Sequence, residues 1–243
     1  MIKNHNQMTF WEHIDELRMF VIKSVSVVII FSIICSLYSE SIKDFIINPV
    51  ASFVNEDPNL RIVYNDPMSP FFLYISVSIF SGLLFSFPFI MYFLLFFLKP
   101  AVSNTKISFF TLILVISTFL FTLGIFFTYK LLIPLSFSFL VGFANGEEMI
   151  FNFNNIINKI LLICLSVGTL FQMPIVAYFL GKINLLSSSL LENNRRYAIL
   201  LSFLISALIT PPDFISQLLL GIPIVMLFEI CIVILKITGR NSN

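Results

Sequence analysis

Long apolar segments dominate the pattern of hydrophobic and polar positions along the chain. A helix that crosses a bilayer needs about 20 mainly apolar residues. Six runs approach or exceed that length, at residues 19–38, 70–98, 107–129, 156–180, 197–210 and 216–236. The pattern therefore predicts an all-α membrane protein with six transmembrane helices, in which residues 1–243 form a single integral membrane domain.

The fifth run is the shortest of the six. A helix over its residues 197–210 would be about 21 Å long, below the roughly 30 Å of a hydrocarbon core. We still expect it to span, because Thr210-Pro211-Pro212-Asp213 forces a reversal and another apolar run follows at once. The last two helices are therefore expected to be short, with either a locally thinned bilayer or helix ends that extend past these boundaries.

Proline residues interrupt three of the runs. Pro88, Pro174 and Pro223 lie inside the second, fourth and sixth runs. Each removes one intrahelical hydrogen bond and favours a kink, although membrane helices tolerate proline in general. We expect a kinked, open, glove-like bundle.

Two longer segments separate the runs on one side. Residues 41–54 place Ile42, Phe45, Ile46 and Pro49 at helical spacing, which predicts a short interfacial helix. Residues 130–155 are apolar and contain Gly142 and Gly146 as breaks, so we expect an outer loop lying on the membrane.

Positive charge is distributed unevenly between the two sides. Ten of the 14 lysines and arginines lie in or beside the N-terminus, the segments 98–106 and 181–196, and the C-terminus. Acidic residues are more frequent on the opposite side. Since cytoplasmic segments carry an excess of Lys and Arg, both termini are predicted to be cytoplasmic, in a multi-pass protein.

Composition excludes several classes of protein. Hydrophobic residues make up 58% of the chain and charged residues only 11%, less than half of what soluble domains usually carry. A soluble globular protein, a disordered chain and a nucleic-acid binder are therefore excluded. An outer-membrane barrel would show short alternating segments instead of long apolar runs.

Candidate catalytic and metal-binding groups are scarce. The two histidines, His5 and His13, lie outside the runs, and no His-Glu-x-x-His or Gly-x-Ser-x-Gly motif occurs. The three cysteines lie in apolar runs, which argues against a disulfide framework or a zinc site. We therefore expect no enzyme activity and no cofactor or metal.

Polar residues inside the runs are few, and they mark function when they occur. Gln172 and Gln217 either form interhelical hydrogen bonds or offer docking points to another helix. Glu229 either pairs with a neighbour or has a proton-linked role. We take these three as candidate groove and partner-contact residues.

Acidic residues precede the first run. On a helix, Glu12, Asp15 and Glu16 share one face, because they are three and four residues apart. They either favour the helix start and pair with a nearby Lys or Arg, or they receive a cationic partner. Paired guanidinium groups would suit them best, through bidentate hydrogen bonds.

Motifs in a fixed order along the chain resemble those of one known family. His13-Ile14-Asp15-Glu16-Leu17-Arg18 resembles the His-x-x-Glu-Leu-Arg signature of the TatC family, the multispanning receptor subunit of the twin-arginine (Tat) protein translocase. The ordered set covers nearly the whole chain. Further matches are Ser69-Pro70-Phe71-Phe72, Phe97-Leu98-Lys99-Pro100-Ala101, Gly124 to Tyr129, Pro134 to Phe139, Phe171-Gln172-Met173-Pro174, Thr210-Pro211-Pro212-Asp213, Ser216-Gln217, Ile222-Pro223 and Phe228-Glu229-Ile230.

This resemblance implies a receptor that binds the Arg-Arg signal peptides of folded precursor proteins. It also implies assembly with TatB-like and TatA-like single-span subunits, self-association, and export driven by the proton-motive force. The membrane implied is the bacterial cytoplasmic membrane. The Phe-, Ile- and Asn-rich composition suits an AT-rich genome, so an organellar inner or thylakoid membrane is the alternative.

The resemblance also implies roles for individual residues. Glu16 would bind the twin arginines, with Arg18 and Asp15 beside it, and Phe97 and Pro100 match positions tied to signal-peptide recognition.

Three further positions match family positions of functional importance, one in an outer loop and two inside the membrane. Pro49 matches a functional proline in the first outer loop. Gln172 and Gln217 match polar positions that face the groove and the partner helices.

The chain departs from the family pattern at two positions. Lys106 stands where the first cytoplasmic loop usually carries a glutamate, so one acid of the expected site is missing, and Glu12, Asp15 or Glu192 are candidates to replace it. Gln172 often corresponds to a glutamate. From the residues alone, a small-solute secondary transporter or channel, or a membrane scaffold, remains an alternative.

Overall fold

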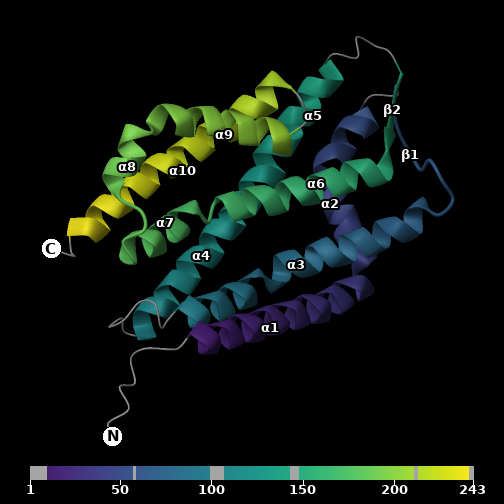
Figure 1. The fold of residues 1–243 in the computed structure, drawn as a ribbon. Coiled ribbons are helices and arrows are strands. Elements are labelled where there is room, and N and C mark those ends of the chain that lie inside the picture. The colour runs from purple at the N-terminus through teal and green to yellow at the C-terminus, as the bar shows by residue number, and fades with distance from the viewer. Residues whose placement is uncertain (1–9, 57–58, 99–106, 143–147, 211–212, 241–243) are drawn as a thin grey trace, which may run out of the picture.

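Helices form nearly all of the structure. The computed structural model describes residues 10–56, 59–98, 107–142, 148–210 and 213–240. Within these residues the chain consists of helices, one pair of short strands and the turns that connect them (Figure 1). The segments long and apolar enough to cross a membrane are Ile14–Leu37, Ser69–Leu98, Ser108–Gly142, Phe153–Lys182 and Phe214–Gly239. The prediction of a helical membrane protein is therefore confirmed, with five such segments among the residues that the structure describes.

Helix α1 (Phe10–Leu37) begins well before the first apolar run, so the acidic segment and the run form one continuous helix. It packs along α3 (Ser69–Leu98), which is also uninterrupted (Figure 1). Gly82 permits the close approach, because a Cβ atom there would lie 2.6 Å from the Ser32 Cα. The two helices therefore touch backbone to backbone, near the middle of α3 and toward the C-terminal end of α1.

Helix α2 (Ser39–Glu56) follows α1 in the sequence and confirms the short helix expected over residues 41–54. Its buried Ile46 and Val50 join a core cluster with Leu73 of α3 and Ile157 of the later helix α6. Pro49 lies inside α2, and the helix continues through it.

The third membrane segment is longer than predicted. Helix α4 (Ile107–Phe127) continues through a π-helical turn, η2 (Thr128–Leu132), into α5 (Ile133–Gly142). The expectation of a loop from residue 130 is therefore wrong as far as residue 142. Continued helix keeps the backbone hydrogen-bonded in an apolar setting, and the π-helical turn lies directly before α5, whose second residue, Pro134, has no N–H to donate.

The fourth segment is broken into α6 (Phe153–Leu170) and α7 (Met173–Lys182). Pro174 is the second residue of α7, so the break expected from this proline is confirmed. Pro88 and Pro223, by contrast, lie inside α3 and the last helix, both of which continue through them.

The C-terminal region contains α8 (Ser188–Asn193), α9 (Arg195–Ile209) and α10 (Phe214–Arg240). The short fifth helix is confirmed, since α9 has 15 residues. The expectation of a short sixth helix is wrong, because α10 has 27 residues. Its polar end stays helical because Leu235 and Thr238 are buried against neighbouring elements.

Strands β1 (Leu60–Val63) and β2 (Met149–Asn152) pair in parallel at the end of the molecule away from both termini (Figure 1). In the same view α1 and α3 lie along one edge of the bundle, and α9 and α10 lie along the other. Helices α6 and α7 run between these edges.

Candidate functional site

The predicted recognition residues Glu16 and Phe97 line one small pocket between α1 and α3. We call it the α1–α3 pocket, and its volume is about 80 Å³. Spacings of three and four residues bring its members onto facing sides of the two helices. The lining residues are Glu16, Met19, Phe20 and Lys23 from α1, and Phe93, Phe96 and Phe97 from α3.

Aromatic contact joins the two walls of this pocket. The rings of Phe20 and Phe97 stack with centroids 6.1 Å apart and planes 25° apart. Glu16 is half-buried beside them. The pocket thus combines a carboxylate with aromatic rings, two groups that a guanidinium can contact together.

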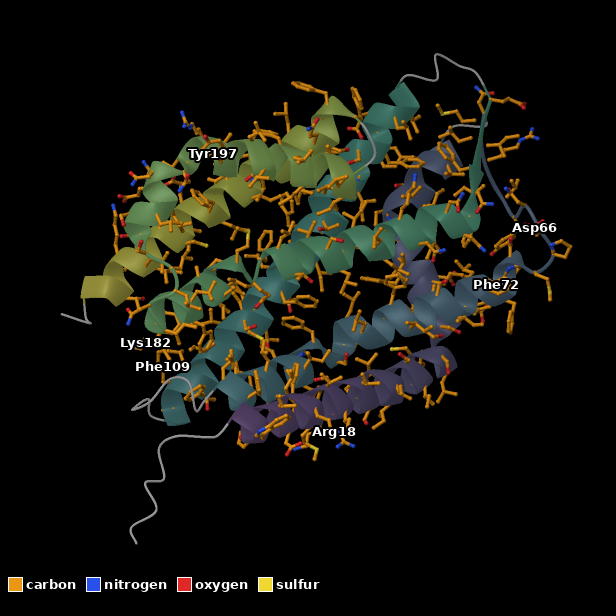
Figure 2. The ribbon with its side chains drawn as sticks, in the orientation of Figure 1. Arg18, Asp66, Phe72, Phe109, Lys182 and Tyr197 are labelled. Carbon is orange, nitrogen blue, oxygen red and sulfur yellow. The ribbon has the colours of Figure 1, made fainter. Side chains whose placement is uncertain are left out.

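The other predicted recognition residues lie elsewhere or outside the described residues. Asp15 and Arg18 are exposed on α1, and Figure 2 labels Arg18 on that helix at the edge of the bundle. Pro100 and Lys106 fall outside the residues that the structure describes, as does the side chain of Glu12.

Gln172 lies at the break between α6 and α7 and is buried. Its Oε1 accepts a hydrogen bond from Ser117 Oγ at 2.6 Å, and its Nε2 donates to Ser117 O at 3.1 Å. The amide therefore joins α4 to the broken helix at two points. Sequence reasoning proposed such an interhelical bond but did not identify Ser117, since a lone serine in an apolar run carries no distinctive signal.

An apolar groove lies beside this contact, between α4, α7 and α10. Its volume is about 580 Å³. Phe171 and Pro174, the neighbours of Gln172, line it, whereas Gln172 itself does not. Phe109, Tyr178 and Ile234 line the end nearest the termini, where the rings of Phe109 and Tyr178 have their centroids 5.6 Å apart.

Gln217 and Pro49 occupy separate places. The Gln217 side chain donates from Nε2 to the Phe203 carbonyl at 3.1 Å, which ties α10 to α9. Pro49 is half-buried within α2, far along the chain from either amide. The structure therefore does not gather the predicted residues into one site.

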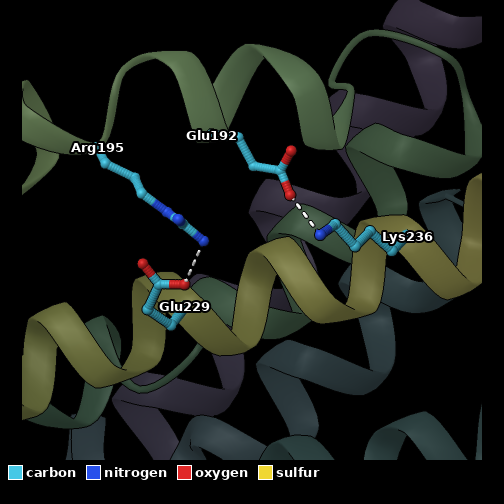
Figure 3. Close-up of polar contacts among 4 residues, drawn as sticks. All are labelled: Glu192, Arg195, Glu229 and Lys236. Atoms are coloured by element: carbon cyan, nitrogen blue, oxygen red, sulfur yellow. Dashed lines mark hydrogen bonds and ion pairs between the residues drawn. The ribbon is translucent and has the colours of Figure 1, made fainter.

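Two ion pairs join α10 to the segment before it (Figure 3). Arg195 Nη2 lies 3.0 Å from Glu229 Oε2, and Lys236 Nζ lies 2.5 Å from Glu192 Oε1. The hydrogen bond from Lys236 lowers the pKa of Glu192 below its usual value. Glu229 thus pairs with a neighbour, one of the two predicted alternatives, and its side chain is still 47% exposed. The partners were missed because they come from segments more than 30 residues apart.

Potential metal ligands do not cluster in the described part of the chain. No group of three or more His, Cys, Asp or Glu side chains there is placed to hold a metal ion.

Comparison with known proteins identifies the family. A family model described as the Sec-independent protein translocase protein TatC matches residues 12–223. The chain belongs to the TatC family. A crystal structure of the twin-arginine translocase receptor TatC superposes with a TM-score of 0.83 at 30% identity, covering 94% of this chain and 100% of that one.

Similar sequences agree with this membership in the TatC family. A tatC-like protein of Gracilaria tenuistipitata var. liui, described as uncharacterized, is 33% identical, with 98% of each chain covered. The Sec-independent protein translocase protein TatC of Desulforapulum autotrophicum is 28% identical over 100% of this chain and 90% of that one. The protein is thus a subunit of the Sec-independent twin-arginine translocase, and the TatC family is not a family of enzymes.

Proposed function

We propose that this TatC-family protein is the receptor for Arg-Arg signal peptides and that the α1–α3 pocket receives the arginine pair. One observation carries the proposal. Glu16 and Phe97, which belong to motifs about 80 residues apart in the sequence, line the same pocket.

The chemistry of the pocket supports a guanidinium ligand. A carboxylate such as Glu16 accepts two parallel N–H bonds from a guanidinium, which a lysine ammonium cannot reproduce. The rings of Phe20 and Phe97 offer faces on which a planar cation can stack. Exposed Asp15 adds negative charge next to Glu16 in the sequence, and Arg18 and Pro100 flank the site along the chain.

The apolar groove is the proposed place for the hydrophobic segment of the signal peptide. It is large enough for side chains of such a segment, at about 580 Å³. Gln172 acts in this scheme by holding α4 against α7, so that the groove keeps its width. Gln217 and Glu229, on the α9–α10 hairpin, and Pro49 of α2 are proposed contact positions for TatB-like and TatA-like single-span subunits or for further copies of this chain.

Topology and location complete the proposal. We infer one membrane domain with six spans, formed by α1, α3, α4–α5, α6–α7, α9 and α10. An even number of spans places both termini on one side, and the bias of Lys and Arg toward the terminal side makes that side cytoplasmic. The membrane is the bacterial cytoplasmic membrane, or an organellar inner or thylakoid membrane. There the receptor nucleates a complex that uses the proton-motive force.

Peptide binding to the purified protein tests the receptor function. We expect an Arg-Arg signal peptide to bind at least tenfold tighter than its Lys-Lys counterpart, about 1.4 kcal/mol. Glu16→Gln should erase that preference, because the neutral amide loses the charge-assisted bonds. Fluorescence anisotropy in detergent or nanodiscs would measure both affinities.

Glu40→Gln is the matched control, since Glu40 is an exposed glutamate at the start of α2. It should keep the preference of the unmodified protein. Equal binding of the two peptides, or equal effects of the two substitutions, would contradict the assignment of the arginine pair to this pocket.

A further inference from the structure

A second pocket lies near the opposite end of the molecule, where α5, β2 and α6 meet the start of α10. We call it the α5–α6 pocket, and its volume is about 380 Å³, within the range of small-ligand sites. Its floor is apolar, with Leu132, Phe137 and Ile160 among the lining side chains. Its polar lining comes from Ser136, Asn152, Asn155, Lys159 and Asp213.

Lys159 and Asp213 give this pocket one charge of each sign. Within the described ranges, neither side chain is within ion-pair distance of an oppositely charged group. Asp213 Oδ2 accepts the Ser216 N–H at 2.7 Å, as expected of a residue that caps the start of α10. The other carboxylate oxygen and the Lys159 ammonium therefore remain available to a ligand.

Helix lengths place the pocket near the depth of lipid headgroups. The α6–α7 segment has 30 residues, about 45 Å if its two helices were collinear, which exceeds the roughly 30 Å hydrocarbon core. Helix α9 has 15 residues, about 22 Å, and falls short of it. Asp213 follows α9 and lines the same pocket as Lys159, which lies six residues after the start of α6. The two charged groups therefore lie deeper toward the membrane centre than the first residue of α6.

We propose that the α5–α6 pocket binds a phospholipid with a zwitterionic aminoethyl phosphate headgroup. The phosphate contacts Lys159, the primary ammonium contacts Asp213, and the adjoining part of an acyl chain lies on the apolar floor. A purely anionic headgroup satisfies only Lys159 and meets repulsion from Asp213. A trimethylated ammonium has no N–H group to donate to the carboxylate, so the pocket distinguishes a primary amine from a quaternary one.

This lipid site is independent of the proposed arginine pocket. It shares no lining residue with the α1–α3 pocket or with the apolar groove. A lipid held there would have its headgroup beside the short α9, where a locally thinned bilayer is one of the two predicted alternatives.

Native mass spectrometry of the full chain, released from mixed micelles, tests the proposal. Three lipids with identical acyl chains would be titrated, bearing phosphoethanolamine, phosphocholine and phosphoglycerol headgroups. We expect the phosphoethanolamine lipid to bind at least fivefold more tightly than the other two. Lys159→Gln should weaken all three, and Asp213→Asn should remove the discrimination between phosphoethanolamine and phosphocholine.

The variants are chosen so that the result does not depend on folding. Asp213→Asn keeps an oxygen to cap α10, and thermal unfolding would verify that the fold is retained. Lys130→Gln is the matched control, since Lys130 is an exposed lysine on η2 that does not line the pocket. It should leave every lipid affinity unchanged.

Several outcomes would overturn the proposal. They are equal binding of the phosphoethanolamine and phosphocholine lipids, equal losses in Lys159→Gln and Lys130→Gln, or competition by soluble glycerophosphoethanolamine at the same concentration as the lipid. The last result would indicate a site for a soluble zwitterion. Arg-Arg peptide binding should be unchanged in Lys159→Gln, which separates this test from that of the receptor function.

Discussion

The N-terminal and C-terminal regions of this protein are held together in different ways. Only 11% of the apolar window of α1 is buried, whereas 61% of the window over α6 and α7 is buried. Helix α1 lies chiefly against α3, while α8 and α9 are tied to α10 by one hydrogen bond and two ion pairs, and α7 packs against α10. The helix with the proposed recognition carboxylate thus depends mainly on packing against one neighbour, whereas the C-terminal helices are also joined by polar contacts.

The contact at Gly82 is the most sensitive point of this comparison. Gly82→Leu should detach α1 from α3, because the new side chain would collide with the Ser32 backbone. Overpacking of this kind typically costs about 1–3 kcal/mol, and a backbone collision should reach the top of that range or exceed it. Thermal unfolding in detergent and limited proteolysis of α1 would measure the effect.

Gly239→Leu is the control for that experiment, since a Cβ atom at Gly239 meets no atom within 4 Å. Similar destabilisation by both substitutions would show that added bulk alone, and not the α1–α3 contact, is responsible.

The buried Gln172 amide, which joins the α6–α7 break to α4, should be the next most sensitive. Gln172→Leu leaves the Ser117 hydroxyl and carbonyl without their partner, which should cost about 1–3 kcal/mol. Adding Ser117→Ala should recover part of the loss, because the orphaned hydroxyl is then absent. Denaturant titrations of both single variants and the double variant would give the coupling free energy. Additive losses would argue against the direct bond.

A smaller effect is expected from the cation in the α1–α3 pocket. Lys23 lines it together with Glu16 and would repel an incoming arginine. Lys23→Gln should therefore tighten Arg-Arg peptide binding about two- to fivefold at low salt, and the gain should shrink as salt screens the charge. Lys182→Gln is the control, since Lys182 is an exposed lysine that does not line this pocket, and it should leave peptide affinity unchanged.

The smallest predicted effect concerns the ion pair of Glu192 at the end of α10. Because its pKa is lowered by Lys236, the pair stabilises the folded state fully above the usual pKa of 4.5. That stabilisation is lost as pH falls through the lowered value. Thermal unfolding between pH 3 and 6 should therefore show a slightly steeper loss in the unmodified protein than in Glu192→Gln.

The pair of Arg61 with Glu148 provides the control, at 3.8 Å and with both side chains 64% exposed. Glu148→Gln should leave the pH dependence unchanged. A curve for Glu192→Gln that matches the unmodified protein would show that its ion pair does not stabilise the C-terminal region.

Much of the helical architecture was predictable, because a helix that crosses a membrane needs a run of apolar residues about as long as the helix itself. The runs predicted α1, α3, α6–α7 and α10, and Pro174 predicted the break. The extension from Tyr129 to Gly142 was not predictable, since an apolar outer loop and a continuing helix have the same composition. The length of α10 was also missed, because burial of Thr238 keeps its polar end helical.

The sequence by itself determined the membrane class, the scarcity of catalytic groups and, through ordered motifs, the resemblance to the TatC family. These properties depend on residue type and local order. Only the tertiary structure decided that Glu16 shares a pocket with Phe97, that Gln172 bonds Ser117, and that Lys159 and Asp213 line one cavity. Such pairs come from helices far apart in the chain, and their contacts depend on how helix faces are rotated and packed, which hydrophobic pattern alone does not specify.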